Sequence, residues 1–148
     1  MSLKARIVDD MKSALRARDV ARLSAIRLAV AAIKQREVDE RIELDDDRVL
    51  EVLERMIKQR RESISHFQSG GREDLASKEA FEIGIIQSYL PEPLSDSELD
   101  DIIQAAILST KAESLRDMGK AMAAIKAKAR GRADMAVISA KLKARLQG

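Results

Sequence analysis

The stretch "YLPEPLSDSELDDII", residues 89–103, decides how the chain is divided. Pro91 and Pro93 end a helix, because proline disfavours the α conformation of the residue before it and has no amide N–H. Ser95 and Glu98 then have the spacing of a capping box, in which each side chain accepts a hydrogen bond from the other residue's backbone amide. The sequence therefore predicts an N-terminal helical domain over residues 1–92 and a C-terminal domain over residues 93–148.

Apolar residues at helical spacing predict four helices before this stretch and three within the C-terminal domain. Ser2, Asp19 and Asp45 are placed to cap the first three helices, and Gly70 ends the third. Ser95, Ser114 and Asp134 are placed to cap the last three. No segment alternates at period two, so the fold class is predicted to be all-α. The apolar faces expected to pack inward include Leu3, Ile7, Met11 and Leu15 in the first helix, Leu75, Phe81, Ile85 and Ile86 in the fourth, and Leu115, Met118, Met122, Ile125 and Ala129 in the sixth.

The composition excludes several kinds of chemistry. The chain of 148 residues has no Cys, one His and no Trp, so disulfides, thiolate zinc sites and cysteine nucleophiles are excluded. His66, near the end of the third helix, is interpreted as a surface residue, and no glycine-rich phosphate loop follows a strand. We expect no catalytic residue, no metal and no cofactor. The N-terminal residues contain no apolar run of signal-peptide or membrane-span length, so a cytosolic protein without a membrane partner is expected.

The net charge of +2 conceals an uneven distribution. Residues 1–90 hold 17 basic and 17 acidic side chains, whereas residues 91–115 hold one basic and six acidic side chains. Residues 116–148 hold nine basic side chains and only two acidic ones, Asp117 and Asp134. Segregation of this kind indicates charged surfaces with different partners.

The basic segment predicts a phosphate-binding surface. On a helix over residues 115–130, the apolar residues form one stripe and the cations cover the remaining surface, without aromatic residues between them. Such a surface suits contact with the phosphates of structured RNA, although a solvated face whose cations complement the helix C-terminus explains the pattern equally well. The candidate RNA-binding residues are Lys120, Lys126, Lys128, Arg130, Arg132, Lys141, Lys143 and Arg145.

Several separate motifs, in order along nearly the whole chain, resemble the YqeY family. They are Lys58-Gln59-Arg60, Gly71-Arg72-Glu73-Asp74-Leu75, the run from Glu79 to Glu82, Tyr89-Leu90-Pro91, Asp117-Met118-Gly119-Lys120 with Met122, and Gly131-Arg132-Ala133-Asp134. The residues that carry this resemblance and that we take as family-motif positions are Lys58, Arg60, Arg72, Asp74, Glu79, Tyr89, Pro91, Gly119, Gly131 and Asp134.

The resemblance implies a fold shared with the C-terminal region of GatB, a subunit of the glutamyl/aspartyl-tRNA amidotransferase, whose tail contacts tRNA. It favours a non-catalytic accessory protein that binds tRNA or another structured RNA. The alternative is an interaction module that docks on amidotransferase subunits or a translation complex, for which the acidic segment 91–115 would face a basic partner. The family label "carbon-nitrogen ligase activity, with glutamine as amido-N-donor" is interpreted as inherited from the larger enzyme, so an enzyme is the third and weakest hypothesis.

Overall fold

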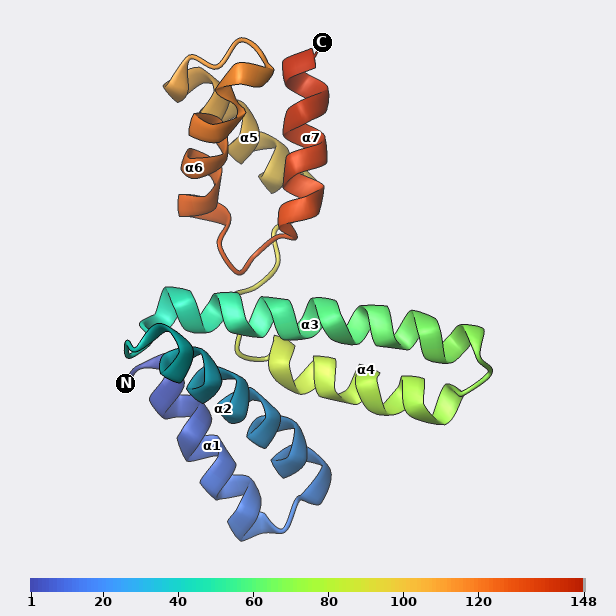
Figure 1. The fold of residues 1–148 in the computed structure, drawn as a ribbon. Coiled ribbons are helices and arrows are strands. Elements are labelled where there is room, and N and C mark those ends of the chain that lie inside the picture. The colour runs from blue at the N-terminus through green and yellow to red at the C-terminus, as the bar shows by residue number, and fades with distance from the viewer. Residues whose placement is uncertain (148) are drawn as a thin grey trace. The chain divides into compact units, whose positions relative to one another are not determined.

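The computed structural model describes residues 1–147, which contain seven α-helices, one 3₁₀ turn and no strand (Figure 1). The predicted all-α fold class is confirmed. Contacts divide the chain between Leu90 and Pro91 into two compact units, here called unit 1 and unit 2. No helix of the described residues is long and apolar enough to cross a membrane. Unit 1 contains α1 (Leu3–Ala17), α2 (Val20–Glu40), α3 (Asp46–Ser69) and α4 (Glu73–Gln87), and unit 2 contains α5 (Asp96–Thr110), η1 (Leu115–Asp117), α6 (Met118–Ala129) and α7 (Met135–Gln147).

The helices begin where the capping residues predict. The side chains of Ser2, Asp19 and Asp45 each accept a hydrogen bond from the backbone amide three residues later. The capping box of α5 is complete, because Ser95 Oγ accepts from the Glu98 amide at 3.1 Å and Glu98 Oε1 accepts from the Ser95 amide at 3.2 Å. These hydrogen bonds with Ser95 hold the pKa of Glu98 below its usual value. The start of unit 2 is thus specified by local sequence.

Three helices end on a long cationic residue in the left-handed region, where glycine is the usual choice. Arg18 closes α1 with φ 57°, Arg41 closes α2 with φ 56°, and Lys111 closes α5 with φ 56°. The backbone N–H of each donates to a carbonyl of the last helical turn. The positive side chains stand at the negative ends of the helix dipoles, which stabilises them there.

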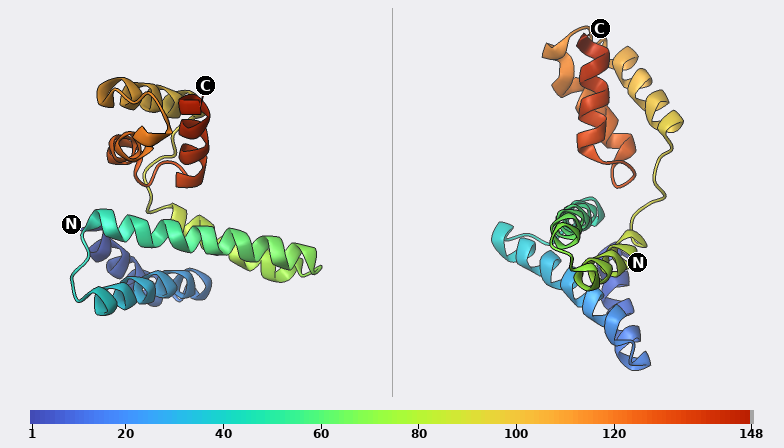
Figure 2. Two further views of the ribbon diagram at one scale, coloured as in Figure 1. Left: turned by 45° about the horizontal axis from the view of Figure 1, so that its top comes forward. Right: turned by 90° about the vertical axis from the view of Figure 1, so that its right-hand side faces the viewer.

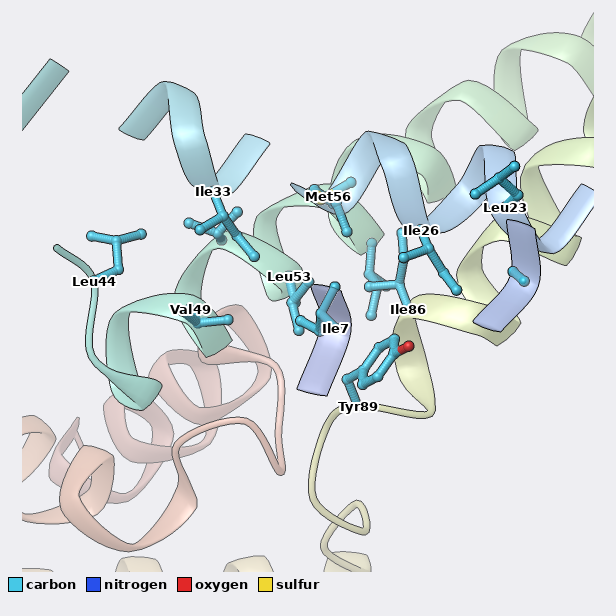
Figure 3. Close-up of a cluster of buried hydrophobic side chains, with 14 residues drawn as sticks. Ile7, Leu23, Ile26, Ile33, Leu44, Val49, Leu53, Met56, Ile86 and Tyr89 are labelled. Atoms are coloured by element: carbon cyan, nitrogen blue, oxygen red, sulfur yellow. The ribbon is translucent and has the colours of Figure 1, made fainter. Parts of the chain in front are cut away.

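The core of unit 1 lies between α1, α2, the first part of α3 and the end of α4 (Figure 3). Ile7, Ile26, Leu53 and Ile86 are fully buried in this core, and the ring of Tyr89 closes it beside Ile7. The packed cluster includes no residue between Ile57 and Ile83. The rest of α3 and α4 therefore forms a two-helix arm beyond the core, visible in Figures 1 and 2.

Two predictions for the apolar faces of unit 1 are wrong. Leu15 is 56% exposed and Ala14 takes its place in the core, because α1 ends two residues later and nothing packs over its last turn. Phe81 is 46% exposed, because it lies on the two-helix arm, which has no third helix to cover α4 at this position. Leu75 is half-buried for the same reason.

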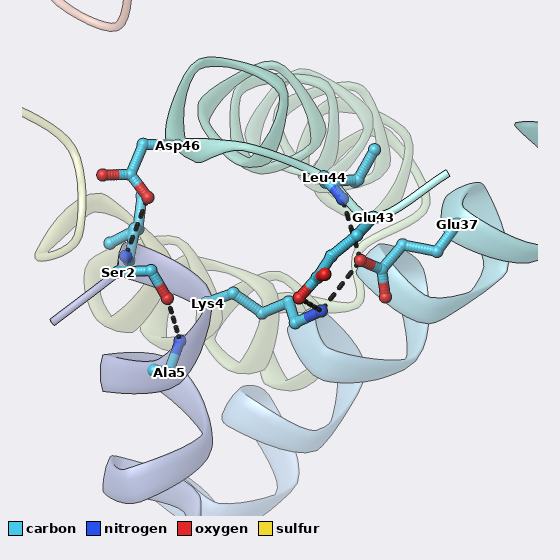
Figure 4. Close-up of polar contacts among 8 residues, drawn as sticks. Ser2, Lys4, Ala5, Glu37, Glu43, Leu44 and Asp46 are labelled. Atoms are coloured by element: carbon cyan, nitrogen blue, oxygen red, sulfur yellow. Dashed lines mark hydrogen bonds and ion pairs between the residues drawn. The ribbon is translucent and has the colours of Figure 1, made fainter. Parts of the chain in front are cut away.

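A network of polar contacts joins the start of α1 to the segment between α2 and α3 (Figure 4). Lys4 Nζ donates to Glu37 Oε2 at 2.9 Å and to Glu43 Oε1 at 3.3 Å, and the Leu44 amide donates to the same Glu37 oxygen at 2.9 Å. The hydrogen bond from Lys4, followed by that from Leu44, lowers the pKa of Glu37. The network fixes the turn that returns the chain to the core at Leu44.

Unit 2 has its own core of aliphatic side chains. Ile103 from α5, Ile125 from α6, and Ile138 and Leu142 from α7 are fully buried. The predicted inward face of α6 is confirmed at Ile125 and Ala129, which are buried, and at Met118 and Met122, which are half-buried. It is wrong at Leu115, which is 44% exposed, because residues 115–117 form a 3₁₀ turn and do not continue the rotation of the α-helix. Ala121, which the stripe did not include, is fully buried.

Candidate nucleic-acid interface

Acidic and basic segments that are separate in the sequence meet inside unit 2. Asp100 of α5 accepts a hydrogen bond from Lys141 Nζ of α7 at 3.0 Å and lies 3.4 Å from a terminal nitrogen of Arg145. Arg145 also donates to the carbonyl of Asp100 at 3.3 Å and to Gln104 Oε1 at 3.2 Å. Lys141 and Arg145 therefore attach α7 to α5, and their charge is partly neutralised within the unit.

Arg132 is engaged by the first residues of unit 2. Its Nε donates to the Glu92 carbonyl at 3.0 Å, and a terminal nitrogen lies 3.9 Å from Glu98 Oε2. The Leu94 amide donates to the Arg132 carbonyl at 2.8 Å. The turn before Arg132 requires Gly131, which is buried with φ 75°, a conformation that favours glycine. The Gly131–Asp134 motif thus holds the segment after Pro91 against the turn between α6 and α7. Pro91 is exposed.

Lys120 is partly compensated within its own segment. Its Nζ lies 3.5 Å from Asp117 Oδ1. The other oxygen of Asp117 accepts from the amides of Glu113 at 2.8 Å and Ser114 at 3.2 Å. These two backbone hydrogen bonds are the main reason that the pKa of Asp117 lies below its usual value. Asp117 thus stabilises the start of η1, and its negative charge is balanced by the positive charge of Lys120.

Three of the candidate cations remain uncompensated. Lys126 and Lys128 of α6 and Lys143 of α7 are exposed, and none forms an ion pair with any residue in the described part of the chain. Arg130 is half-buried at the C-terminal end of α6, where its amide donates to the Lys126 carbonyl. Since an α-helix turns about 100° per residue, Lys126 and Lys128 point about 200° apart. They flank the buried stripe of α6 on its two sides.

The family-motif residues of the α3–α4 arm form a partly buried charge cluster. Arg60 Nε donates to Glu82 Oε2 at 2.9 Å and lies 3.8 Å from Glu79 Oε2, and a terminal nitrogen of Arg60 donates to the Met56 carbonyl at 3.4 Å. Glu82 is 6% exposed. The sequence placed Glu82 at the end of the motif run that begins at Glu79, but it did not identify Glu82 as the principal partner of Arg60, because the pairing depends on the register between two helices.

Other motif residues have local structural roles. Arg72, just before α4, forms two hydrogen bonds with the Asp74 carboxylate at 3.1 and 3.0 Å. Asp134 Oδ1 accepts from the Ala136 amide at 2.8 Å and so caps α7. Lys58 and Gly119 are exposed, and a Cβ added at Gly119 would meet no atom within 4 Å. Packing explains neither of these two residues.

The structure offers little for catalysis among the described residues. No group of three His, Asp or Glu side chains is placed to hold a metal ion in residues 1–147. His66 is exposed near the end of α3. A pocket of about 70 Å³ between α1 and α2 is lined by Val8, Val30 and Ile33, with Lys4, Lys34 and Glu37 at its edge. Its lining contains no hydroxyl or imidazole group.

The chain is similar to curated proteins named "Altered inheritance of mitochondria protein 41, mitochondrial". It is 36% identical to the protein of Kluyveromyces lactis over 112 residues, which cover 74% of this chain and 60% of the relative. It is 36% identical to that of Eremothecium gossypii over 96 residues, covering 64% and 52%. With the protein of Pyrenophora tritici-repentis it shares 28% identity over 140 residues, covering 93% and 77%. The match thus spans about half to three quarters of the length of these relatives.

These names correct one expectation. The relatives are named as mitochondrial proteins, which contradicts the cytosolic location expected from the N-terminal residues. The expectation failed because it relied on the composition of the first residues alone.

A family model described as "Yqey-like protein" matches residues 4–146, which include all seven helices except the first residue of α1 and the last residue of α7. The match covers the motifs in both units, from Lys58 to Asp134. The YqeY domain is related to the C-terminal region of GatB. The chain belongs to the YqeY-like protein family.

Proposed function

We propose that this protein is a non-catalytic accessory protein that binds tRNA or another structured RNA through unit 2. The observation that carries the proposal is the contrast among the cations of this unit. Lys120, Arg132, Lys141 and Arg145 are each engaged by a neighbouring acid, whereas Lys126, Lys128 and Lys143 are exposed and form no ion pair in residues 1–147.

The paired cations have a second role in this proposal. Lys141 and Arg145 join α7 to α5, and Arg132 joins the α6–α7 turn to the start of α5. With the buried aliphatic cluster of unit 2, these contacts present the exposed lysines on a fixed framework. Lysines bind phosphates as point charges, and binding of this kind depends little on base sequence. The relationship of the family to the GatB C-terminal region supports RNA as the polyanion.

Filter binding of the full chain to tRNA tests the proposal. If the three exposed lysines neutralise about three phosphates, log K falls against log salt with a slope of roughly −3. The variant Lys126→Glu, Lys128→Glu, Lys143→Glu should lose binding while its circular dichroism spectrum stays unchanged, because none of these side chains is packed in the core. A matched control in unit 1, Arg16→Glu, Arg18→Glu, Arg22→Glu, should retain most of the affinity.

Equal loss of tRNA binding in both variants would mean that the RNA contacts extend over the whole protein, which contradicts a site in unit 2. Absence of tRNA binding by the wild-type protein at low salt would favour the second candidate, a module that docks on another protein, such as an amidotransferase subunit. The observation that favours this candidate is Phe81, which is 46% exposed on α4 next to the open surface at Gly84. Exposed aromatic side chains are typical of protein interfaces.

A further inference from the structure

The charge balance of unit 1 as a whole conceals a strongly basic helical hairpin. Residues 11–36, "MKSALRARDVARLSAIRLAVAAIKQR", contain seven basic side chains and a single acid, Asp19. Asp19 is itself engaged, since its Oδ1 accepts from the Arg22 amide as the cap of α2. Asp9 and Asp10 lie about two helical turns before Arg16 on α1, and Glu37, Asp39 and Glu40 lie at the far end of α2, where Glu40 pairs with Arg36. The α1–α2 turn itself therefore carries uncompensated positive charge.

Three arginines crowd the turn itself. Arg16 occupies the last turn of α1, Arg18 is the left-handed residue that closes this helix, and Arg22 lies in the first turn of α2. All three are exposed. Arg16 donates to Ser13 Oγ at 3.2 Å, and none of the three forms an ion pair within residues 1–147. Within unit 1, the turn projects beyond α3 and α4 in Figure 1 and in the right-hand view of Figure 2.

Exposed aliphatic side chains lie among these arginines. Leu15 is 56% exposed and Val20 is 75% exposed, one on each side of the turn, and Leu28, two helical turns further along α2, is 42% exposed. We define the basic tip as Leu15, Arg16, Arg18, Val20 and Arg22. Aliphatic groups in water raise the free energy of the free protein, so a partner that covers them and also binds cations suits this surface best.

We propose that the basic tip docks on the surface of an anionic phospholipid bilayer. Such a surface has phosphate groups outside and apolar chains immediately beneath them, which matches arginines that flank exposed aliphatic side chains. Guanidinium groups form paired hydrogen bonds with phosphate oxygens. Leu15 and Val20 reach the boundary between headgroups and acyl chains. RNA matches the tip less well, since it offers phosphates but no apolar layer for Leu15 and Val20.

Binding by the tip is peripheral and reversible. Two aliphatic side chains bury little area, so the attraction depends mainly on charge and weakens with salt. Co-flotation of the full chain with vesicles tests the proposal. Vesicles of phosphatidylcholine mixed with phosphatidylglycerol should bind the protein at low salt and release it at high salt, and vesicles of phosphatidylcholine alone should not bind it.

Two variants locate the contact. Arg16→Gln, Arg18→Gln, Arg22→Gln should weaken binding by about a hundredfold, because each arginine near an anionic surface contributes about fivefold. Leu15→Gln, Val20→Gln should weaken it at unchanged charge, and both residues are exposed, so the fold is retained. The matched control is Arg55→Gln, Arg61→Gln, Lys78→Gln, which removes the same charge from exposed positions of α3 and α4 and should leave vesicle binding unchanged.

Several results would overturn the proposal. One is failure of the wild-type protein to bind the anionic vesicles, and another is equal loss of binding in the arginine variant and in its matched control. Unchanged binding after Leu15→Gln, Val20→Gln would mean that no side chain enters the bilayer. If the arginine variant loses affinity for tRNA instead of vesicles, the tip is an RNA site and the bilayer proposal is wrong.

Discussion

The hydroxyl group of Tyr89 donates a 2.6 Å hydrogen bond to Oδ2 of Asp10, although 79 positions separate the two residues in the sequence. The guanidinium group of Arg6 lies over the same ring, 5.1 Å from its centroid, within the range of a cation–π interaction. Tyr89 is 5% exposed. The last residues before Pro91 are thus anchored to α1, and the link to unit 2 leaves from a fixed point of unit 1.

We expect Tyr89→Phe to lower the free energy of unfolding by about 1 to 2 kcal/mol, because it removes a hydrogen bond to a charged acceptor while keeping the ring. Burial, followed by the hydrogen bond to Asp10, raises the pKa of Tyr89 above the ordinary value of 10.0. The neutral tyrosine therefore favours the folded state, and its contribution is complete below pH 10 and declines at higher pH. Urea unfolding of both proteins should show their difference shrinking above pH 10. A constant difference would contradict this account.

Replacing Glu82 with Leu should destabilise unit 1 by about 3 kcal/mol, the lower end of the range for removing one partner of a buried ion pair, because Glu79 remains 3.8 Å from Arg60. The double variant Arg60→Met, Glu82→Leu should recover most of this loss, since no buried charge is left alone. Asp74→Ala, which breaks an exposed ion pair with Arg72, is the control and should change the stability little. Thermal unfolding measures all three, and a double variant as unstable as Glu82→Leu would disprove the charge argument.

The Lys4–Glu37 contact makes the free energy of unfolding depend on pH in the acidic range. Because the pKa of Glu37 is lowered in the folded protein, its ionised form favours folding at every pH above its ordinary value of 4.5, and this contribution disappears as the pH falls below it. Glu37→Gln should therefore be less stable than the wild-type protein at neutral pH, with a difference that shrinks below pH 4.5. Glu43→Gln, at an 85% exposed side chain, is the control and should show little difference at either pH.

Unit 2 should fold when it is expressed alone. A fragment of residues 91–148 contains its complete capping box and a separate cluster of buried aliphatic residues, so we expect a helical circular dichroism spectrum and a cooperative thermal transition. Three short helices bury a small core, so the fragment should be only marginally stable. Ser95→Ala should reduce its stability by about 1 kcal/mol. A random-coil spectrum would mean that the unit depends on residues 1–90.

The features that the sequence predicted are those determined locally. Ser2, Asp19, Asp45 and Ser95 cap their helices because a cap requires only a side chain and an amide three residues away. The exposure of Leu15 and Leu115 could not be predicted from spacing, since it depends on what packs over a helix end and on a turn that departs from α geometry.

The candidate site was predictable only in outline. The sequence indicated a basic C-terminal segment, but a helical projection could not show that Lys141 and Arg145 meet Asp100 while Lys126, Lys128 and Lys143 do not. These pairings depend on how α5 and α7 pack. The net charge of the first 90 residues also concealed the basic tip. Acidic residues of unit 1 balance its arginines in the total charge, but they form no ion pair with these arginines within residues 1–147.

The residues that end α1, α2 and α5 are in the left-handed region without being glycine, so glycine at these positions would relieve backbone strain. A non-glycine residue in this conformation costs about 1 kcal/mol or more. The substitutions Arg41→Gly and Lys111→Gly would therefore raise the heat tolerance of the protein. Both positions lie outside the two proposed binding surfaces. At Arg18 the same substitution would remove a cation of the basic tip. Selection for thermal tolerance alone would replace all three residues, whereas selection that also preserves bilayer docking would spare Arg18.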